Sequence, residues 1–231
     1  MTIDLTRLCI HDGLLIIEGE GVHPIGRDTV CLALRTDEVG AGTALVIGCG
    51  NGLLALRLAR RGIRVVAVDI NENAVLTCSR NAVLNHVADD LRTLHADIMC
   101  AGDIGSYDLV VTNPPQLPTG HTNPGDGRHS WISLANDGGE NGRAFIEWLC
   151  EHAENLLNPG GSLMFTHFDY LNPDDTVHRL RTRGFEVAVD PGITKAVGAL
   201  SGERLRRLGV ELDGYRVLVI LARLPPGGTY Q

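Results

Sequence analysis

Apolar and polar positions along the chain follow two alternating patterns. Short apolar runs, typical of buried strands, occupy 43–47, 64–68, 91–95, 107–111 and 162–167. Amphipathic stretches, typical of helices, follow or separate them at 53–61, 73–85 and 143–157. Strands that alternate with helices pair in parallel through right-handed crossovers. The pattern therefore predicts a doubly wound α/β sheet.

The two ends of the chain depart from this alternation. Near the N-terminus, a hairpin is predicted at Asp12-Gly13 and a helix is predicted to begin near Asp28. Towards the C-terminus, two more strands are predicted at 185–189 and 215–221. A long segment without a regular pattern separates these last two strands.

Length and loop composition define the domain organisation that we expect. The 231 residues fit one large domain better than two. We expect residues 1–40 to form an N-terminal segment that covers the active site of a main domain at 41–231. Within that domain, 116–141 is a long polar loop rich in Gly, Pro, Asn and His. Such a loop in a compact domain is more often functional than idle, so we expect it to contact a substrate.

Charge and cysteine content narrow the class of protein. The net charge is −8, so the surface repels phosphate backbones and nucleic acid is an unfavoured partner. Six cysteines occur without a C-x-x-C pair, which indicates neither a metal site nor a secreted disulfide framework. No apolar run approaches the ~20 residues that span a bilayer, and the N-terminus has no signal-peptide pattern. We therefore expect a cytoplasmic protein without a membrane partner.

A glycine-rich turn, Gly48-Cys49-Gly50-Asn51-Gly52, lies between the first strand of the predicted sheet and its helix. Glycines bring the backbone close to a ligand, and the free N–H groups of the following helix attract a carboxylate. The dinucleotide fingerprint G-x-G-x-x-G requires a third glycine where Leu53 stands. The spacing G-x-G-x-G is instead typical of a site for S-adenosylmethionine (SAM), so the turn is predicted to bind SAM. A nicotinamide dinucleotide site and a purely structural turn are the alternatives.

Two aspartates follow the next strands of the predicted sheet. Asp69 ends the second strand, where a carboxylate can accept hydrogen bonds from both ribose hydroxyls; a helix cap is the alternative. Asp97 follows the third strand and is predicted to accept from the adenine amino group; a solvated loop aspartate is the alternative. Ile98 is expected to lie against the adenine ring. Ile70, next to Asp69, is also predicted to bind the cofactor.

The tetrapeptide Asn113-Pro114-Pro115-Gln116 follows the fourth predicted strand. It resembles the N-P-P-Y motif of amino methyltransferases that act on glutamine or adenine nitrogens. Together with the glycine turn, 68–70 and 137–143, it makes the chain similar to the release-factor glutamine N-methyltransferases over about 22–168. The resemblance implies a class I methyltransferase fold. That fold is a Rossmann-like, seven-stranded, mostly parallel sheet that ends in a C-terminal antiparallel hairpin.

The resemblance also implies roles for the tetrapeptide. SAM carries a reactive methyl group, so the enzyme chiefly has to align a nitrogen lone pair with it. In the family, the Asn side-chain oxygen and the carbonyl of the first proline accept the N–H groups of the acceptor, and here these are Asn113 and Pro114. Asn113 is expected to contact SAM as well. Two positions depart from the family: Gln116 replaces an aromatic residue that stacks on a planar acceptor, and Val46 stands where an acidic residue is usual.

The acceptor is expected to be a small nitrogen-containing metabolite, such as an amino acid or a biosynthetic intermediate. Release-factor enzymes carry a helical N-terminal domain for their protein substrate, and the ~40 residues before the sheet are too few for an independent domain. The residues predicted to bind the acceptor are Pro115, Gln116, His121 and Trp131.

Three alternatives to this acceptor remain open. The first is a protein glutamine or an RNA adenine. The second is a SAM-binding protein without turnover. The third is O- or C-methylation, which requires a base to deprotonate the acceptor. The sequence does not predict the oligomeric state.

Overall fold

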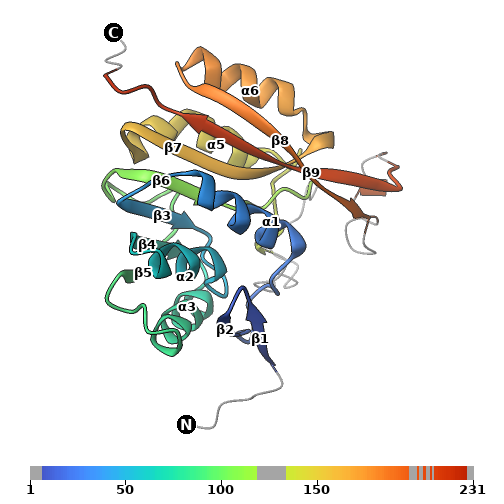
Figure 1. The fold of residues 1–231 in the computed structure, drawn as a ribbon. Coiled ribbons are helices and arrows are strands. Elements are labelled where there is room, and N and C mark those ends of the chain that lie inside the picture. The colour runs from blue at the N-terminus through green and yellow to red at the C-terminus, as the bar shows by residue number, and fades with distance from the viewer. Residues whose placement is uncertain are drawn as a thin grey trace.

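The computed structural model describes residues 7–118, 134–197 and 211–227, with single positions 202, 205, 206 and 209. Within these ranges, seven strands form one sheet in the spatial order β5-β4-β3-β6-β7-β9-β8 (Figure 1). The strands are β3 (Thr43–Ile47), β4 (Arg64–Asp69), β5 (Leu91–His95), β6 (Tyr107–Thr112), β7 (Leu157–Phe168), β8 (Glu186–Ala196) and β9 (Gly214–Arg223). Strands β3 to β7 pair in parallel, and β9 lies antiparallel between β7 and β8. The predicted mostly parallel sheet with a C-terminal antiparallel hairpin is confirmed.

Helices cover both faces of the sheet. One face carries α1 (Arg27–Arg35), α2 (Leu53–Arg60) and α3 (Glu72–Leu84), and the other carries α5 (Ala144–His152) and α6 (Pro173–Thr182). Successive strand side chains point to opposite faces, so on β3 Val46 packs on the α2 side and Ile47 on the α5 side. Short 3-10 turns occur at η2 (Thr36–Glu38), η3 (Ala153–Leu156) and η4 (Asp169–Leu171). None of the helices in the described part of the chain has the length and apolar composition that a membrane crossing requires.

The structure differs from the sequence prediction mainly in the C-terminal half. β7 begins at Leu157 and runs through the Asn-Pro-Gly-Gly sequence that predicts a break. Gly160 has a φ of 81° and the register with β6 shifts there, so the glycines form an irregularity within the strand. β8 extends to Ala196, beyond its predicted end at 189. α6 is not predicted from the sequence, because only Thr176 and Leu180 of its residues are buried and no apolar stripe results.

A separate two-stranded sheet precedes the main one. β1 (Leu8–His11) and β2 (Leu14–Ile17) pair antiparallel around Asp12-Gly13, so the predicted hairpin is confirmed. Asp12 and Gly13 have φ values of 51° and 72°. This left-handed conformation at both positions is the one that a tight two-residue hairpin turn requires, and Asp and Gly tolerate it better than most residues.

Asparagine side chains of α3 fasten this hairpin to the main domain. Asn81 donates to the Ile17 carbonyl at 2.9 Å and accepts from the Ile17 N–H at 3.0 Å. One turn later, Asn85 makes the same pair of bonds with Leu15, at 2.7 and 2.9 Å. Residues four apart share one helix face, so the two amides bond β2 much as a neighbouring strand does. Asn81 also donates to the Asn51 carbonyl at 2.9 Å, which links the hairpin to the glycine turn.

Replacing Asn81 with leucine tests this attachment. Asn81 is fully buried, so the change leaves backbone groups of Ile17 and Asn51 without partners, at ~1–3 kcal/mol for each unsatisfied buried group. We expect Asn81→Leu to lower the free energy of unfolding in urea by about 2–4 kcal/mol. Asn85→Leu is the matched control, because its partners are open to water, and a loss below about 1 kcal/mol is expected. Equal losses from both substitutions would contradict this role of burial.

Candidate active site

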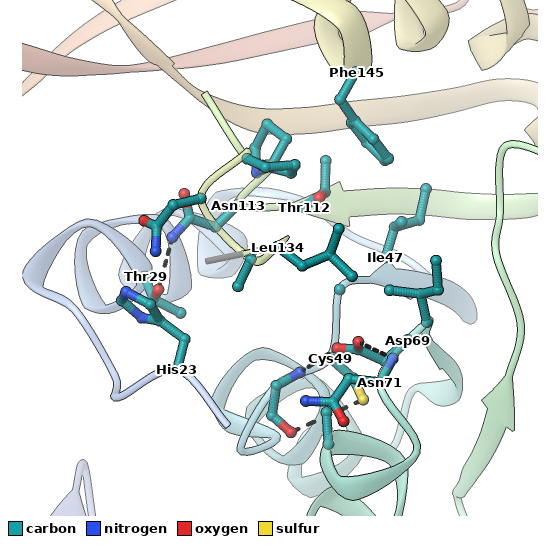
Figure 2. A pocket seen from close by; sticks show the side chains of 18 of the residues that line it. His23, Thr29, Ile47, Cys49, Asp69, Asn71, Thr112, Asn113, Leu134 and Phe145 are labelled. Atoms are coloured by element: carbon teal, nitrogen blue, oxygen red, sulfur yellow. Dashed lines mark hydrogen bonds between the residues drawn. The ribbon is translucent and has the colours of Figure 1, made fainter. Parts of the chain in front are cut away.

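A cavity of about 400 Å³ opens at the carboxyl ends of the parallel strands (Figure 2). β3 pairs with β4 and with β6, so Ile47 lies beside Val68 on one side and Thr112 on the other. The glycine turn leaves β3 directly after Ile47, and Asn113 leaves β6 directly after Thr112. The two loops therefore open side by side at one edge of the sheet.

The glycine turn presents bare backbone to this cavity. Gly48 and Gly50 have φ values of 71° and 51°, and a Cβ added to either would meet no atom within 4 Å. Their left-handed conformation favours glycine, and their Cα atoms face open space. Gly52 differs, because its Cβ would come within 3.1 Å of the Cys78 sulfur on α3. The first two glycines thus leave room for a ligand, and the third leaves room for a neighbouring helix.

Asp69 joins the glycine turn to the end of β4. One carboxylate oxygen accepts the Gly50 N–H and the other accepts the Asn71 N–H, each at 2.9 Å. Burial raises the pKa of this carboxyl, while the hydrogen bonds from Gly50 and Asn71 lower it. The cap of α3 is Asn71, which accepts the Asn73 N–H at 3.0 Å. The helix-cap alternative for Asp69 therefore does not apply.

Two residues predicted to contact adenine, Asp97 and Ile98, and the predicted cofactor residue Ile70 form another part of the cavity wall. Ile98 is buried, and Ile70 leaves 42% of its surface exposed. The Asp97 side chain is exposed and accepts the Met99 N–H at 3.0 Å. The structure thus brings this predicted group to the same cavity as Asp69.

Part of the N-terminal segment forms a further wall, and buried asparagines hold it there. Asn51 accepts the Gly19 N–H and donates to the His23 carbonyl, both at 2.8 Å. Asn71 donates to the Gly21 carbonyl at 3.0 Å. The side chain of Asn51, a predicted cofactor ligand, is therefore engaged with this segment. Val22 to Gly26, Asp28 and Thr29 line the cavity.

Cys49 is the other residue of the turn with a side chain at the cavity wall. Its thiol is buried beside the thiol of Cys78. Hydrogen bonding with Cys78, together with burial, raises the pKa of Cys49 well above its usual range. The thiol therefore stays protonated at neutral pH, and it contributes a small apolar surface to the wall.

Asn113 is held between two threonines. Its Nδ2 donates to Thr29 Oγ1 at 2.8 Å (Figure 2), and its Oδ1 accepts from Thr166 Oγ1 at 2.5 Å. Thr29 belongs to α1 and Thr166 to β7, so two separate elements fix one side chain. The sequence does not single out Thr166, because a threonine within an apolar strand is expected to belong to the core.

Pro114, Pro115 and Gln116 all line the cavity, and the Gln116 side chain also reaches β7. The Gln116 oxygen accepts the Phe168 N–H at 2.8 Å, and its Nε2 donates to the Thr166 carbonyl at 3.1 Å. Only 1% of Gln116 is exposed. Its side-chain amide is therefore engaged by the sheet.

Apolar residues that the sequence does not single out also contribute to the lining. Leu134 and Phe145 point into the cavity (Figure 2). Apolar residues at a loop and a helix start carry no chemical signal, so the sequence gives no reason to select them. The segment 137–143 lies close to the tetrapeptide, because a Cβ on Gly142 would fall 2.7 Å from the Gln116 carbonyl oxygen. The predicted acceptor residues His121 and Trp131 lie outside the described residues.

The chain is similar in sequence to several methyltransferases. The sequence profile of the methyltransferase small domain matches residues 26–125. A candidate protein N5-glutamine methyltransferase from Methanocaldococcus jannaschii is 30% identical over 184 residues, which cover 76% of this chain and 90% of that protein. The release factor glutamine methyltransferase of Deinococcus radiodurans is 34% identical over 169 residues, or 71% of this chain and 58% of that protein. A tRNA1(Val) (adenine(37)-N6)-methyltransferase from Tolumonas auensis is 33% identical over 142 residues, or 60% of this chain and 56% of that protein.

A solved structure shares the fold. The E. cuniculi methyltransferase complex that modifies the translation termination factor eRF1 matches with a TM-score of 0.58 and 21% identity, over 88% of this chain and 99% of that chain. The names of the sequence relatives specify protein glutamine and tRNA adenine. These names favour a protein glutamine or an RNA adenine as the acceptor. They do not support the small metabolite that we expect from the sequence. The similarity to a tRNA methyltransferase also weakens the prediction that nucleic acid is an unfavoured partner.

Substitution of Asp69 tests the cofactor site. Asp69→Asn is expected to weaken SAM binding about 10- to 100-fold, because a hydrogen bond to a charged group contributes ~1.5–3 kcal/mol. Isothermal titration calorimetry measures the change. Asp108→Asn is the matched control, since Asp108 accepts the Gly42 and Thr43 N–H groups, both at 2.9 Å, at the opposite end of the sheet. Asp108→Asn should lower the free energy of unfolding but leave the affinity for SAM within about twofold of the wild type. An unchanged affinity in Asp69→Asn would contradict the prediction that Asp69 binds the ribose.

Proposed function

Since the chain belongs to the class I SAM-dependent methyltransferases of the Asn-Pro-Pro type, we propose that it methylates the side-chain nitrogen of a glutamine in a protein. The observation that carries this proposal is the pairing of β6 with β3, which sets Asn113 and Pro114 beside the glycine turn in one cavity. The similarity to the M. jannaschii protein, which extends over 90% of its length, supports glutamine as the acceptor.

The residues present fit SAM as the cofactor. Open space at the Cα atoms of Gly48 and Gly50 leaves room for a ligand against the backbone. The largely buried Asp69 carboxylate suits the ribose hydroxyls, and Asp97 with Ile98 suits the adenine. The volume of about 400 Å³ falls within the ~300–1,000 Å³ of small-molecule sites. When bound, SAM supplies an electrophilic methyl group, so the chain does not need to activate the donor.

The chain's own part in the reaction is to hold the acceptor nitrogen. Asn113 Oδ1 accepts from Thr166 through one lone pair and has a second lone pair for an acceptor N–H. The Pro114 carbonyl receives only a long contact, 3.4 Å from Gln116 Nε2, so it can take the other N–H of a carboxamide. The two prolines fix the backbone that carries this carbonyl. Two oxygens set on a rigid turn restrict the nitrogen to the orientation that transfer requires.

Two features favour glutamine over adenine as the acceptor. A nucleobase taken into an enzyme pocket is held by stacking between apolar or aromatic side chains. Position 116 of the tetrapeptide is a glutamine without a ring, and its side chain is buried against β7. A carboxamide is a smaller planar group than a nucleobase, and the oxygens of Asn113 and Pro114 can hold its N–H groups directly, so it depends less on a stacking partner. The net charge of −8 also disfavours a tRNA backbone.

The domain organisation belongs to the same proposal. We propose that residues 1–40 cover the active site of the domain at 41–231, and that the loop 116–141 contacts the protein substrate. The cavity lining by Val22 to Gly26, and the bonds from Asn51 and Asn71 to this segment, support the first part. The position of Pro115 and Gln116 at the start of the loop, next to the cavity, supports the second.

A labelling experiment tests the acceptor class. Purified protein is incubated with tritiated-methyl SAM and, in parallel, an unmethylated bacterial release factor, an unmodified tRNA transcript or a small-molecule extract. We expect label in the release factor, at a glutamine located by mass spectrometry. Asn113→Ala should lower kcat by about 10²-fold or more. Asn158→Ala is the control, because that amide bonds Asp108 at the opposite end of the sheet, and its kcat should not change.

Each other result of this experiment selects a different function. Label in the tRNA alone would replace glutamine by adenine as the acceptor. Label confined to the extract would favour a small metabolite. SAM binding without turnover on any of the three would indicate the non-catalytic alternative. Full activity of Asn113→Ala would remove Asn113 from the acceptor site and point to O- or C-methylation.

A further inference from the structure

A series of buried and part-buried hydrogen bonds connects the backbone of β7 to the predicted acceptor site. It runs from Phe168 through Gln116 and Thr166 to Asn113, and it ends at Thr29 on α1. Gln116 and Thr166 are 1% and 0% exposed. Their polar groups therefore bond one another, Asn113 and the neighbouring backbone rather than an acceptor.

The direction of each bond follows from the first one. A backbone N–H can only donate, so the Phe168 N–H identifies the atom 2.8 Å away as the oxygen of the Gln116 amide. The Gln116 Nε2 is then a donor that lies 3.1 Å from the Thr166 carbonyl oxygen and 3.3 Å from Thr166 Oγ1, and it donates to both. A hydroxyl carries one proton and can accept while it donates. The Thr166 hydroxyl, which accepts from Gln116, is left to donate its proton to Asn113.

The distance between Thr166 and Asn113 identifies the atom that receives this proton. Thr166 Oγ1 lies 2.5 Å from Asn113 Oδ1, within the ~2.5–3.0 Å of O–H···O bonds and below the ~2.7–3.2 Å of N–H···O bonds. Asn113 Nδ2 consequently faces Thr29 Oγ1, at 2.8 Å. A flipped Asn113 amide would bring Nδ2 too close to Thr166 and would leave the Thr166 proton without an acceptor. The series therefore specifies one orientation of the Asn113 amide.

We propose that Thr166 is the positioning residue of the acceptor site, and that Gln116 acts through Thr166 to keep the Asn113 amide in this orientation. The inference rests on the proposed function, in which Asn113 Oδ1 accepts an N–H of the acceptor. An Asn113 amide free to turn would at times present its own N–H groups to those of the acceptor, and the reacting geometry would be lost. An orientation fixed before the acceptor arrives avoids this reorganisation.

Three variants of the full chain test the proposal by kinetics. Thr166→Val removes the hydroxyl but keeps the shape, and it should lower kcat on the release factor about 10- to 100-fold, the size of effect that a small misplacement produces. The Kd for SAM and the KM for the release factor should change less than about threefold. Thr166→Ser restores the hydroxyl and should return kcat to within about threefold of the wild type. Thr36→Val removes another fully buried hydroxyl, 2.7 Å from the Ala33 carbonyl at the end of α1, and should leave kcat unchanged.

Side-chain amide NMR gives a readout that does not need turnover. The Asn113 and Gln116 NH₂ signals, assigned from Asn113→Asp and Gln116→Glu, should exchange slowly with solvent. Thr166→Val should shift the Asn113 signals and speed their exchange, while the signals of Asn81 stay as they are. Unchanged Asn113 signals in Thr166→Val would overturn the positioning role, and so would altered signals with a normal kcat. A wild type that methylates no glutamine would overturn the proposed function alone, and the NMR result would still decide whether Thr166 orients Asn113.

Discussion

The parallel pairing of β3 with β6 is the constraint on which the rest of the site depends. Main-chain hydrogen bonds set Ile47 beside Thr112, so the glycine turn and Asn113 leave the sheet as neighbours. The chain then diverges: β3 leads to α2 on one face, and the loop after β6 leads to α5 on the other. A crevice at the carboxyl ends of the strands follows from this reversal of strand order, and a ligand can enter there.

The framework can be predicted from the sequence because burial on both faces marks its strands. Each residue of β3 from Ala44 to Ile47 is buried, and such continuous apolar runs stand out. Elements with a weaker apolar signal escape prediction. α6 buries only Thr176 and Leu180, and the irregular start of β7 depends on how its glycines meet β6 rather than on local preference.

The residues of the candidate site also fall into two groups: motif residues, which the sequence predicts, and the residues that hold them in place, which it does not. Gly48, Asp69 and Asn113 stand at strand ends, where residue type and spacing carry information about a ligand. The residues that hold them in place act across the fold. Thr166 is hydrogen-bonded to Asn113, 53 positions away in the sequence, and Asn81 to Ile17, 64 positions away. Neither Thr166 nor Asn81 is conspicuous in its local sequence. The role of a buried threonine or asparagine depends on its hydrogen-bond partner, and only the folded chain shows which residue that is.

The order of the last strands has a consequence for how the sheet is completed. β8 is synthesised before β9, yet β9 lies between β7 and β8. Until residues 214–223 have left the ribosome, β8 has no partner strand and β7 keeps an open edge, and both can attract other chains. A nascent or truncated chain without β9 thus loses an interior strand rather than a marginal one. β9 joins two parts of the sheet, β7 and β8, that do not pair with each other without it.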